Sequence, residues 1–255
     1  MENIVFYFSG TGNSLKVAKT IANKLENGKI ISMAKNESYN LTGQYDSIGF
    51  VYPTYFGGLP NKVYKFINNI IINNDNNVFF YAITTYGGFL ANGLSQIDEI
   101  FLNKHNLKIN YGQKIVMVPN YIVKYNWNIK ISKVIKRADK KTGQVIESIK
   151  NKENKSIKKH ILYKYFDKYY WEKMKQVPSM DKDYNINSNC TVCGICEEVC
   201  PVKNIEIINK IPQFKHNCEQ CVACIQYCPQ KAINYKDITQ NRRRYTNPEI
   251  NYKEL

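Results

Sequence analysis

The strongest constraint on the fold is a duplicated cysteine pattern in the last third of the sequence. All eight cysteines lie between residues 190 and 228, and the first 189 residues contain none. The segment NCTVCGICEEVCPVKNI, residues 189–205, returns 28 residues later as NCEQCVACIQYCPQKAI, residues 217–233. Because Asn, four Cys, Pro, Lys and Ile recur in register, the two segments are copies of one metal-binding unit.

Each copy has the spacing C-x₂-C-x₂-C-x₃-C-P. A disulfide scaffold is disfavoured, because such scaffolds are short and carry a secretory signal, and neither feature is visible here. Structural zinc sites also use CxxC pairs. Two such pairs would satisfy a zinc ion, however, which gives no reason for a third evenly spaced cysteine or for the trailing proline. The spacing therefore favours iron–sulfur clusters over zinc.

Residues 184–235 resemble a bacterial ferredoxin with two 4Fe–4S clusters. In that family the fourth cysteine of each unit ligates the other cluster. The resemblance thus implies one cluster held by Cys190, Cys193, Cys196 and Cys228, and a second held by Cys218, Cys221, Cys224 and Cys200. The small residues Gly194 and Ala223 let backbone N–H groups approach the cluster sulfides.

The first 119 residues alternate between apolar runs and helical patterns. Continuous apolar runs suit strands that are buried on both faces of a parallel sheet. Five strands with interleaved helices predict a doubly wound α/β domain with a five-stranded parallel sheet. The strands are expected at Ile4–Phe8, Lys29–Met33, Ser47–Tyr52, Val78–Thr84 and Lys114–Val118, and the helices at Ser14–Leu25, Asn61–Ile72 and Ala91–Asn103.

A glycine-rich turn, FSGTGNSLK at residues 8–16, joins the first strand to the first helix. Backbone N–H groups and the helix dipole converge at such a turn and bind anions. No Gly-Lys pair is present, so the turn is not a Walker A loop for nucleoside triphosphates. Leu15 stands where the dinucleotide fingerprint needs its third glycine, which disfavours NAD or FAD. A plain turn with a good N-cap remains the simplest alternative.

The turn resembles the phosphate loop with which flavodoxins bind FMN. Its residues are Ser9, Gly10, Thr11, Gly12, Asn13 and Ser14. Two further loops, residues 52–60 and 84–93, leave the carboxyl ends of neighbouring strands, where ligands bind in open α/β sheets. The resemblance implies that they clasp the flavin ring, with candidates Pro53, Thr54, Tyr55, Phe56, Gly57, Gly58, Thr85, Tyr86, Gly87 and Gly88. Flavodoxins typically carry carboxylates here, but residues 53–60 and 84–93 have none.

Residues 120–182 separate these two parts and hold most of the positive charge. They contain 17 Lys and Arg against 6 Asp and Glu, a net +11 of the total +15. We expect a helical connector that packs on the flavodoxin-like domain, with one helix broken at Gly143 and another over residues 156–175. The expected domains are residues 1–119, 120–182 and 183–255, the last being a small α+β ferredoxin with a C-terminal tail.

Residues 1–119 and 183–235 together resemble proteins of anaerobic bacteria and archaea that fuse a flavodoxin to a two-cluster ferredoxin, and the middle helices match them only loosely. The resemblance implies an electron-transfer protein relaying electrons between two 4Fe–4S clusters and FMN, with no catalytic residues of its own. A flavin-dependent reductase of a quinone or nitro compound is the alternative. We expect redox protein partners with an acidic docking face, no nucleic acid, no membrane span, no NAD(P) site and a cytoplasmic location.

Overall fold

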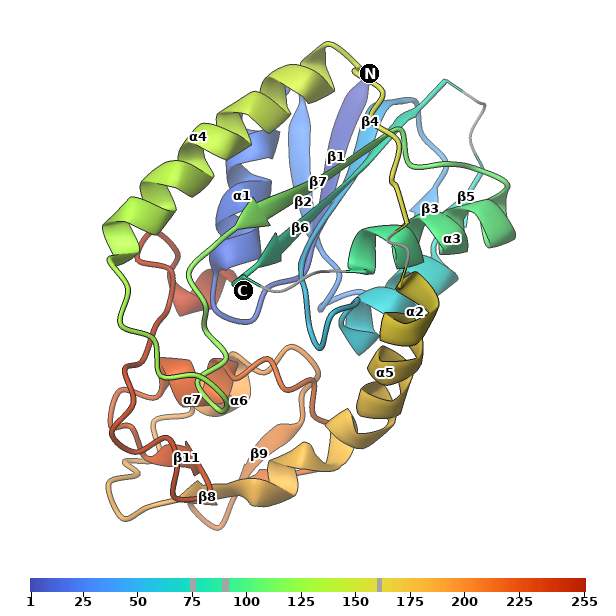
Figure 1. Ribbon diagram of the computed structural model, residues 1–255. Helices are drawn as coiled ribbons and strands as arrows, with labels where there is room; N and C mark the ends of the chain where they lie inside the picture. The colour runs from blue at the N-terminus through green and yellow to red at the C-terminus, as the bar shows by residue number, and fades with distance from the viewer. Residues whose placement is uncertain (74–76, 89–91, 160–161) are drawn as a thin grey trace.

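The centre of the fold is a five-stranded sheet whose neighbouring strands are all parallel (Figure 1). The computed structural model describes residues 1–73, 77–88, 92–159 and 162–255. The strand order is β2-β1-β4-β6-β7, which is the flavodoxin-like order 2-1-3-4-5 when these strands are counted along the chain. The strands are β1 (Glu2–Tyr7), β2 (Gly28–Ser32), β4 (Tyr45–Pro53), β6 (Phe79–Tyr86) and β7 (Tyr111–Val116).

Helices cover both faces of the sheet, because successive strand residues point to opposite sides. In β1, Ile4 and Phe6 pack in a core beneath α2 and α3, whereas Val5 and Tyr7 pack beneath α1 and α4. Figure 1 shows the same two layers. The predicted five-stranded doubly wound domain is therefore confirmed. The helices are α1 (Asn13–Ala22), α2 (Asn61–Asn69), α3 (Gly93–His105) and α4 (Ile131–Lys150).

Helix α4 is longer than the sequence pattern predicts, because Gly143 does not break it. Glycine in a helix interior costs about 1 kcal/mol relative to alanine. Gly143 lies on the exposed side, while Ala138, Val145 and Ile149 bury the opposite side against the sheet. Burial of that apolar face offsets the free-energy cost of the glycine in the helix interior. The fourth helix thus completes the layer that α1 begins.

The second helix predicted in the middle segment, in contrast, is shorter than expected. Helix α5 covers Tyr163–Gln176, and part of the predicted start, residues 160–161, lies outside the described residues. Lys155 pairs with Tyr111 of the edge strand β7 through a parallel bridge. Ile157 then packs over Gly112, where a Cβ atom would lie only 2.4 Å from the Ile157 side chain. The chain from Lys155 to Ile157 therefore lies along the edge of the sheet, where the start of the helix was predicted.

Helix α5 packs beside α2 and leads into the cysteine-rich part (Figure 1). The Tyr170 hydroxyl donates to the carbonyl of Leu59 (2.6 Å), and Trp171 meets the Tyr64 ring edge-on. A 3₁₀ helix, Val177–Asp183, follows α5. The connector therefore lies against the sheet domain through α5 as well as α4.

The cysteine-rich part is built from two short antiparallel pairs and two short helices. Strand β8 pairs with β11, and β9 pairs with β10. The predicted small α+β arrangement is present. Its elements are β8 (Tyr184–Ile186), α6 (Ile195–Glu198), β9 (Ile205–Ile208), β10 (Ile211–Phe214), α7 (Ala223–Tyr227) and β11 (Ile233–Tyr235).

Two small elements complete the secondary structure. A small parallel pair, β3 (Asn40–Leu41) with β5 (Ile71–Ile72), was not predicted, and a last 3₁₀ turn covers Tyr252–Glu254.

The cysteine-rich part lies at the edge of the sheet where the parallel strands end (Figure 1). In the part of the chain that the structure describes, no helix has the length and apolarity to cross a bilayer.

Candidate functional site

The turn at residues 9–14, here called the phosphate loop, sits between β1 and α1. Gly12 has φ +91°, a left-handed conformation that favours glycine. The first intrahelical bond runs from the Lys16 N–H to the Gly12 carbonyl (2.9 Å), so the N–H groups of residues 13–15 have no intrahelical partner. Lys16 itself turns away and pairs with Asp139 (2.6 Å) and Glu249 (2.5 Å). The loop therefore presents N–H groups and hydroxyls without a cation.

The predicted flavin loops meet at the carboxyl edge of the sheet. The Ser14 hydroxyl bonds that of Thr85 (2.8 Å), which joins the first loop to the third. Together they line a hollow at this edge of the sheet. Its lining comprises Ser9, Gly10, Thr11, Asn13, Ser14, Pro53, Thr54, Tyr55, Thr85, Tyr86, Gly87, Met117, Val118 and Asn120.

Five predicted candidates are not in this lining: Gly12, Phe56, Gly57, Gly58 and Gly88. Gly12 belongs to the phosphate loop and shapes its backbone. Phe56 instead packs in a small core with Tyr170 and Met174 of α5 and meets the Tyr121 ring edge-on. Residues 89–91 of the third loop lie outside the described residues. Tyr55 and Tyr86 are thus the aromatic side chains that line the hollow.

Sequence reasoning missed a fourth segment of the site, residues 117–120 after β7. Asn120 donates to the Thr11 hydroxyl (2.6 Å), and Asn13 donates to the Val118 carbonyl (3.1 Å). The rule that ligands bind at the carboxyl ends of strands could have found this segment, because β7 ends at the same edge as β1, β4 and β6.

The C-terminal segment, residues 245–255, closes over the phosphate loop from the other side. The Asn247 N–H donates to the Thr11 carbonyl (2.8 Å), and the Tyr245 hydroxyl donates to Asn13 Oδ1 (2.8 Å). Ile250 contacts Gly12, where a Cβ atom would lie 3.0 Å from Ile250 Cβ. The sequence carries no motif that signals this return, because the contacts use ordinary polar and aliphatic residues.

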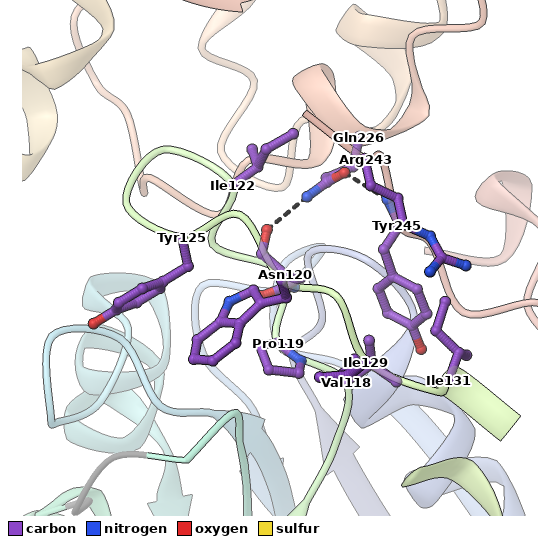
Figure 2. A pocket seen from close by; sticks show the side chains of 11 residues that line it. Val118, Pro119, Asn120, Ile122, Tyr125, Ile129, Ile131, Gln226, Arg243 and Tyr245 are labelled. Carbon is purple, nitrogen blue, oxygen red and sulfur yellow. Dashed lines mark hydrogen bonds between the residues drawn. The ribbon is translucent and has the colours of Figure 1, made fainter. Parts of the chain in front are cut away.

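Figure 2 shows how this region is tied to the cysteine-rich part. Gln226 of α7 donates to the Asn120 carbonyl (2.6 Å) and accepts from the Tyr245 N–H (2.7 Å). Asn120 and Tyr245 in turn bond the phosphate loop. One helix of the cysteine-rich part is therefore joined to the phosphate loop by two short chains of hydrogen bonds.

Four cysteines from both repeats surround a second hollow, and we call them the outer set: Cys190, Cys193, Cys196 and Cys228. Burial raises the pKa of Cys196 to about 11, and the nearby thiols of Cys193, Cys228 and Cys190 add to the rise. Among the described residues, no three His, Cys, Asp or Glu side chains form a group that could hold a single metal ion. The outer thiols instead line a shared hollow. Cys193 is exposed.

The other four cysteines form the inner set: Cys218, Cys221, Cys224 and Cys200. Burial raises the pKa of Cys218 to about 12, and Cys200 of the first repeat is among the charges that add to this rise. Burial likewise raises the pKa of Cys221 and Cys224, with Cys200 again among the neighbours. Buried thiols of this kind lose their protons readily only when a positively charged metal centre compensates the charge.

Backbone N–H groups point at the sulfurs in corresponding places of the two repeats. The Asn204 N–H donates to Cys200 Sγ (3.1 Å), and the Ala232 N–H, 28 residues on, donates to Cys228 Sγ (3.2 Å). A third bond runs from the Gln220 N–H to Cys218 Sγ (3.2 Å). Such bonds stabilise thiolates and tune the electronics of a bound cluster.

The inner cysteine loop contacts the loops that are predicted to bind flavin. A Cβ atom on Gly10 would lie 2.9 Å from the Cys221 carbonyl oxygen and 2.9 Å from the Tyr55 hydroxyl, so only glycine permits this approach. Glu219 Oε1 accepts from the Lys62 N–H (2.7 Å) at the start of α2, a favourable place for a carboxylate. Burial nonetheless raises the pKa of Glu219 to about 7.

Two family models match the chain in these regions. The flavodoxin domain matches residues 4–105, and the 4Fe-4S binding domain matches residues 184–206, which contain the first cysteine repeat. No curated protein matches significantly. The chain thus combines a flavodoxin domain with a 4Fe–4S ferredoxin motif, in agreement with a flavodoxin–ferredoxin fusion. These domains indicate a flavin and a 4Fe–4S cluster as cofactors and support an electron-transfer role.

Three solved structures each overlap with about 60% of this chain at low sequence identity. A flavodoxin of Streptococcus pneumonia TIGR4 is 17% identical, with 59% of this chain and 98% of that chain covered at a TM-score of 0.36. The Trp repressor binding protein of Bacillus subtilis is 11% identical, with 62% of this chain and 100% of that chain covered at a TM-score of 0.35. Rubredoxin oxygen:oxidoreductase of Desulfovibrio gigas is 12% identical, with 59% of this chain and 36% of that chain covered at a TM-score of 0.35. The fold assignment rests on the strand order rather than on these overlaps.

Proposed function

We propose that this protein relays electrons between two 4Fe–4S clusters and a bound FMN. One observation carries the proposal: the inner cysteine loop lies directly on the loops that line the flavin hollow, with Cys221 against Gly10 and Tyr55. Clusters exchange one electron at a time, whereas a flavin takes one or two. A chain that brings both sites to one interface therefore suits coupling between one-electron and two-electron partners.

The residues around the hollow fit FMN. N–H groups at the start of α1 and the hydroxyls of Ser9, Thr11 and Ser14 would hold the phosphate, because such donors bind anions at a helix N-terminus. Tyr55 and Tyr86 would flank the ring, and backbone groups of residues 85–87 would lie at its edge. Asn120 and the C-terminal segment would keep the phosphate loop in its binding shape. When bound, FMN supplies the two-electron chemistry.

The cysteine sets fit two clusters with crossed ligation. The outer set would hold one cluster and the inner set the other, as the grouping of Cys228 with the first repeat and Cys200 with the second supports. The chain's part is to bury the thiolates, to direct N–H groups at the sulfurs and to keep the inner set near the flavin loops. We expect no direct oxidation of NADH or NADPH.

The test is an anaerobic measurement on the purified holoprotein. Acid extraction should release FMN, and iron and sulfide analysis should give two clusters per chain. Stopped-flow reduction should then show flavin bleaching at a rate that is independent of protein concentration, because the transfer is internal. A flavin rate that falls in proportion to dilution would contradict the relay. Rapid turnover of purified quinones or nitro compounds would instead support the reductase alternative.

A further inference from the structure

Tyr55 is the side chain that contacts both cofactor sites. It belongs to the lining of the flavin hollow. It also packs against a small core that contains Cys221, Ala223 and Val199 of the cysteine-rich part. Its ring meets Phe8 edge-on at the end of β1, which fixes its orientation from the sheet side. Tyr55 therefore bridges the two domains at the point where the inner cysteine loop approaches the phosphate loop.

The hydroxyl of Tyr55 is buried and has no hydrogen-bond partner among the described residues. Leaving such a donor unpaired costs about 1–3 kcal/mol, so an acceptor atom of a bound group beside it would stabilise this hydroxyl. The charges that act on this hydroxyl come from Cys221, Glu219 and Cys218, all in the inner loop. A Cβ atom on Gly10 would lie 2.9 Å from both the Tyr55 hydroxyl and the Cys221 carbonyl oxygen, so the hydroxyl lies beside the inner cysteine loop.

We propose that the Tyr55 hydroxyl donates a hydrogen bond to a sulfur of the inner cluster and raises the reduction potential of that cluster. The inference rests on the proposed function, because it takes the inner set as the ligands of a 4Fe–4S cluster. Tyr55 is a positioning and tuning residue in this role. It is contributed by the flavodoxin domain, so the potential of the inner cluster depends on contact between the domains.

The direction of the effect follows from electrostatics. Reduction adds negative charge to a cluster, and a donor directed at its sulfur stabilises that charge, which is one way in which proteins set cluster potentials. The outer set has no corresponding neighbour from the flavodoxin domain in the lining of its hollow, and its Cys193 is exposed. Removing the hydroxyl should therefore lower one midpoint and leave the other unchanged.

The experiment is an anaerobic redox titration of the holoprotein and its Tyr55→Phe variant. Each midpoint is assigned through the paramagnetically shifted β-protons of the cysteine ligands. The inner midpoint should fall by up to about 59 mV, which is a tenfold change in a one-electron equilibrium. Tyr55→Leu should shift it in the same direction. The matched control is Tyr227→Phe, because the Tyr227 hydroxyl is also buried without a partner in the same small core, but its neighbouring charge is Glu254.

An unchanged inner midpoint in Tyr55→Phe, or an equal shift of both midpoints, would overturn the proposal. So would an equal shift in Tyr227→Phe, because the effect would then belong to the packing of this core. The proposed function fails separately, through cofactor analysis: protein that holds both clusters but no FMN would refute the relay and leave the titration readable.

Discussion

The two cysteine loops have nearly the same backbone but different surroundings. Corresponding residues adopt positive φ in both copies: 56° at Val192 and 52° at Gln220, then 81° at Gly194 and 56° at Val222. A β-branched residue rarely adopts this conformation, so Val222 shows how strictly the loop shape is imposed. The common cysteine spacing therefore imposes the same backbone shape in both copies, even where the residues between the cysteines differ.

The residues that differ between the copies decide which one faces the flavodoxin domain. Thr191 of the outer loop corresponds to Glu219, which bonds the start of α2. Glu197 and Glu198 are exposed, but their counterparts are buried: Ile225 is 0% exposed and Gln226, 5% exposed, bonds Asn120. The duplication thus supplies two similar cysteine loops, and a few substitutions turn one of them into a domain interface.

The largest expected effect tests whether the copies exchange their fourth ligands. Cys228→Ser should destroy the outer cluster, although Cys228 belongs to the second repeat, and about half of the iron should be lost. Cys200→Ser should destroy the inner cluster instead. Iron analysis and EPR of the reduced variants measure both outcomes. Loss of the inner cluster from the Cys228 variant would show that each repeat binds its own cluster.

A smaller effect is expected at the polar link between α7 and the flavodoxin domain. Gln226→Leu leaves the Tyr245 N–H without its acceptor and removes one of two donors to the Asn120 carbonyl, which still accepts from the Ile122 N–H. The local contact should weaken by about 2 kcal/mol, which is roughly 30-fold faster hydrogen exchange of the Tyr245 amide. The matched control is Glu198→Leu at the corresponding exposed position. If both variants exchange alike, Gln226 does not hold the interface.

Removing the carboxylate at the start of α2 should have a smaller effect still. Glu219→Ala takes an acceptor from the Lys62 N–H. Loss of a capping group costs about 1 kcal/mol, so the amides of the first turn of α2 should exchange roughly fivefold faster. Thr191→Ala in the outer loop is the control and should leave α2 unchanged. If the first-turn amides of α2 exchange equally fast in the wild type and in Glu219→Ala, the carboxylate does not cap this helix.

Much of the flavodoxin part could be predicted because its signals are local. Apolar runs located all five strands of the sheet to within a few residues, and the rule for carboxyl ends brought Ser14 and Thr85 together. The resemblance to two-cluster ferredoxins implied that Cys228 groups with the first repeat, and Cys228 lines the same hollow as Cys190, Cys193 and Cys196. In each case the sequence pattern and the tertiary contact depend on the same residues.

The remaining features depend on contacts that are distant in sequence. Gly143 reads as a helix breaker locally, but burial of Val145 and Ile149 against the sheet holds α4 together. Lys155 joins the edge of β7 rather than a helix, because unpaired groups on an edge strand are available to it. The return of Asn247 to Thr11 joins residues from opposite ends of the chain. No local pattern encodes such a contact.

The smallest expected effect concerns where electrons enter from outside. The outer loop exposes Cys193, whereas the inner loop is covered by the flavodoxin domain, so a reductant should reach the outer cluster first. Glu197 and Glu198 beside Cys196 should repel an anionic reductant such as dithionite. Replacing both with glutamine should therefore speed cluster reduction by a few-fold at low salt, because charges near a site steer encounter. Stopped-flow absorbance measures the rate.

The basic helix α4 provides the opposing test. Lys136 and Lys140 are exposed there, in the segment for which we expect an acidic docking partner. Replacing these two lysines with glutamine also removes two charges, but from α4 rather than from a cysteine loop, so dithionite should reduce the clusters at the wild-type rate. The effect at Glu197 and Glu198 should vanish at 1 M salt, where the Debye length is about 3 Å. If the α4 variant slows reduction as much as the outer-loop variant speeds it, electrons enter by a route that includes the basic face, and exposure of Cys193 does not decide the entry point.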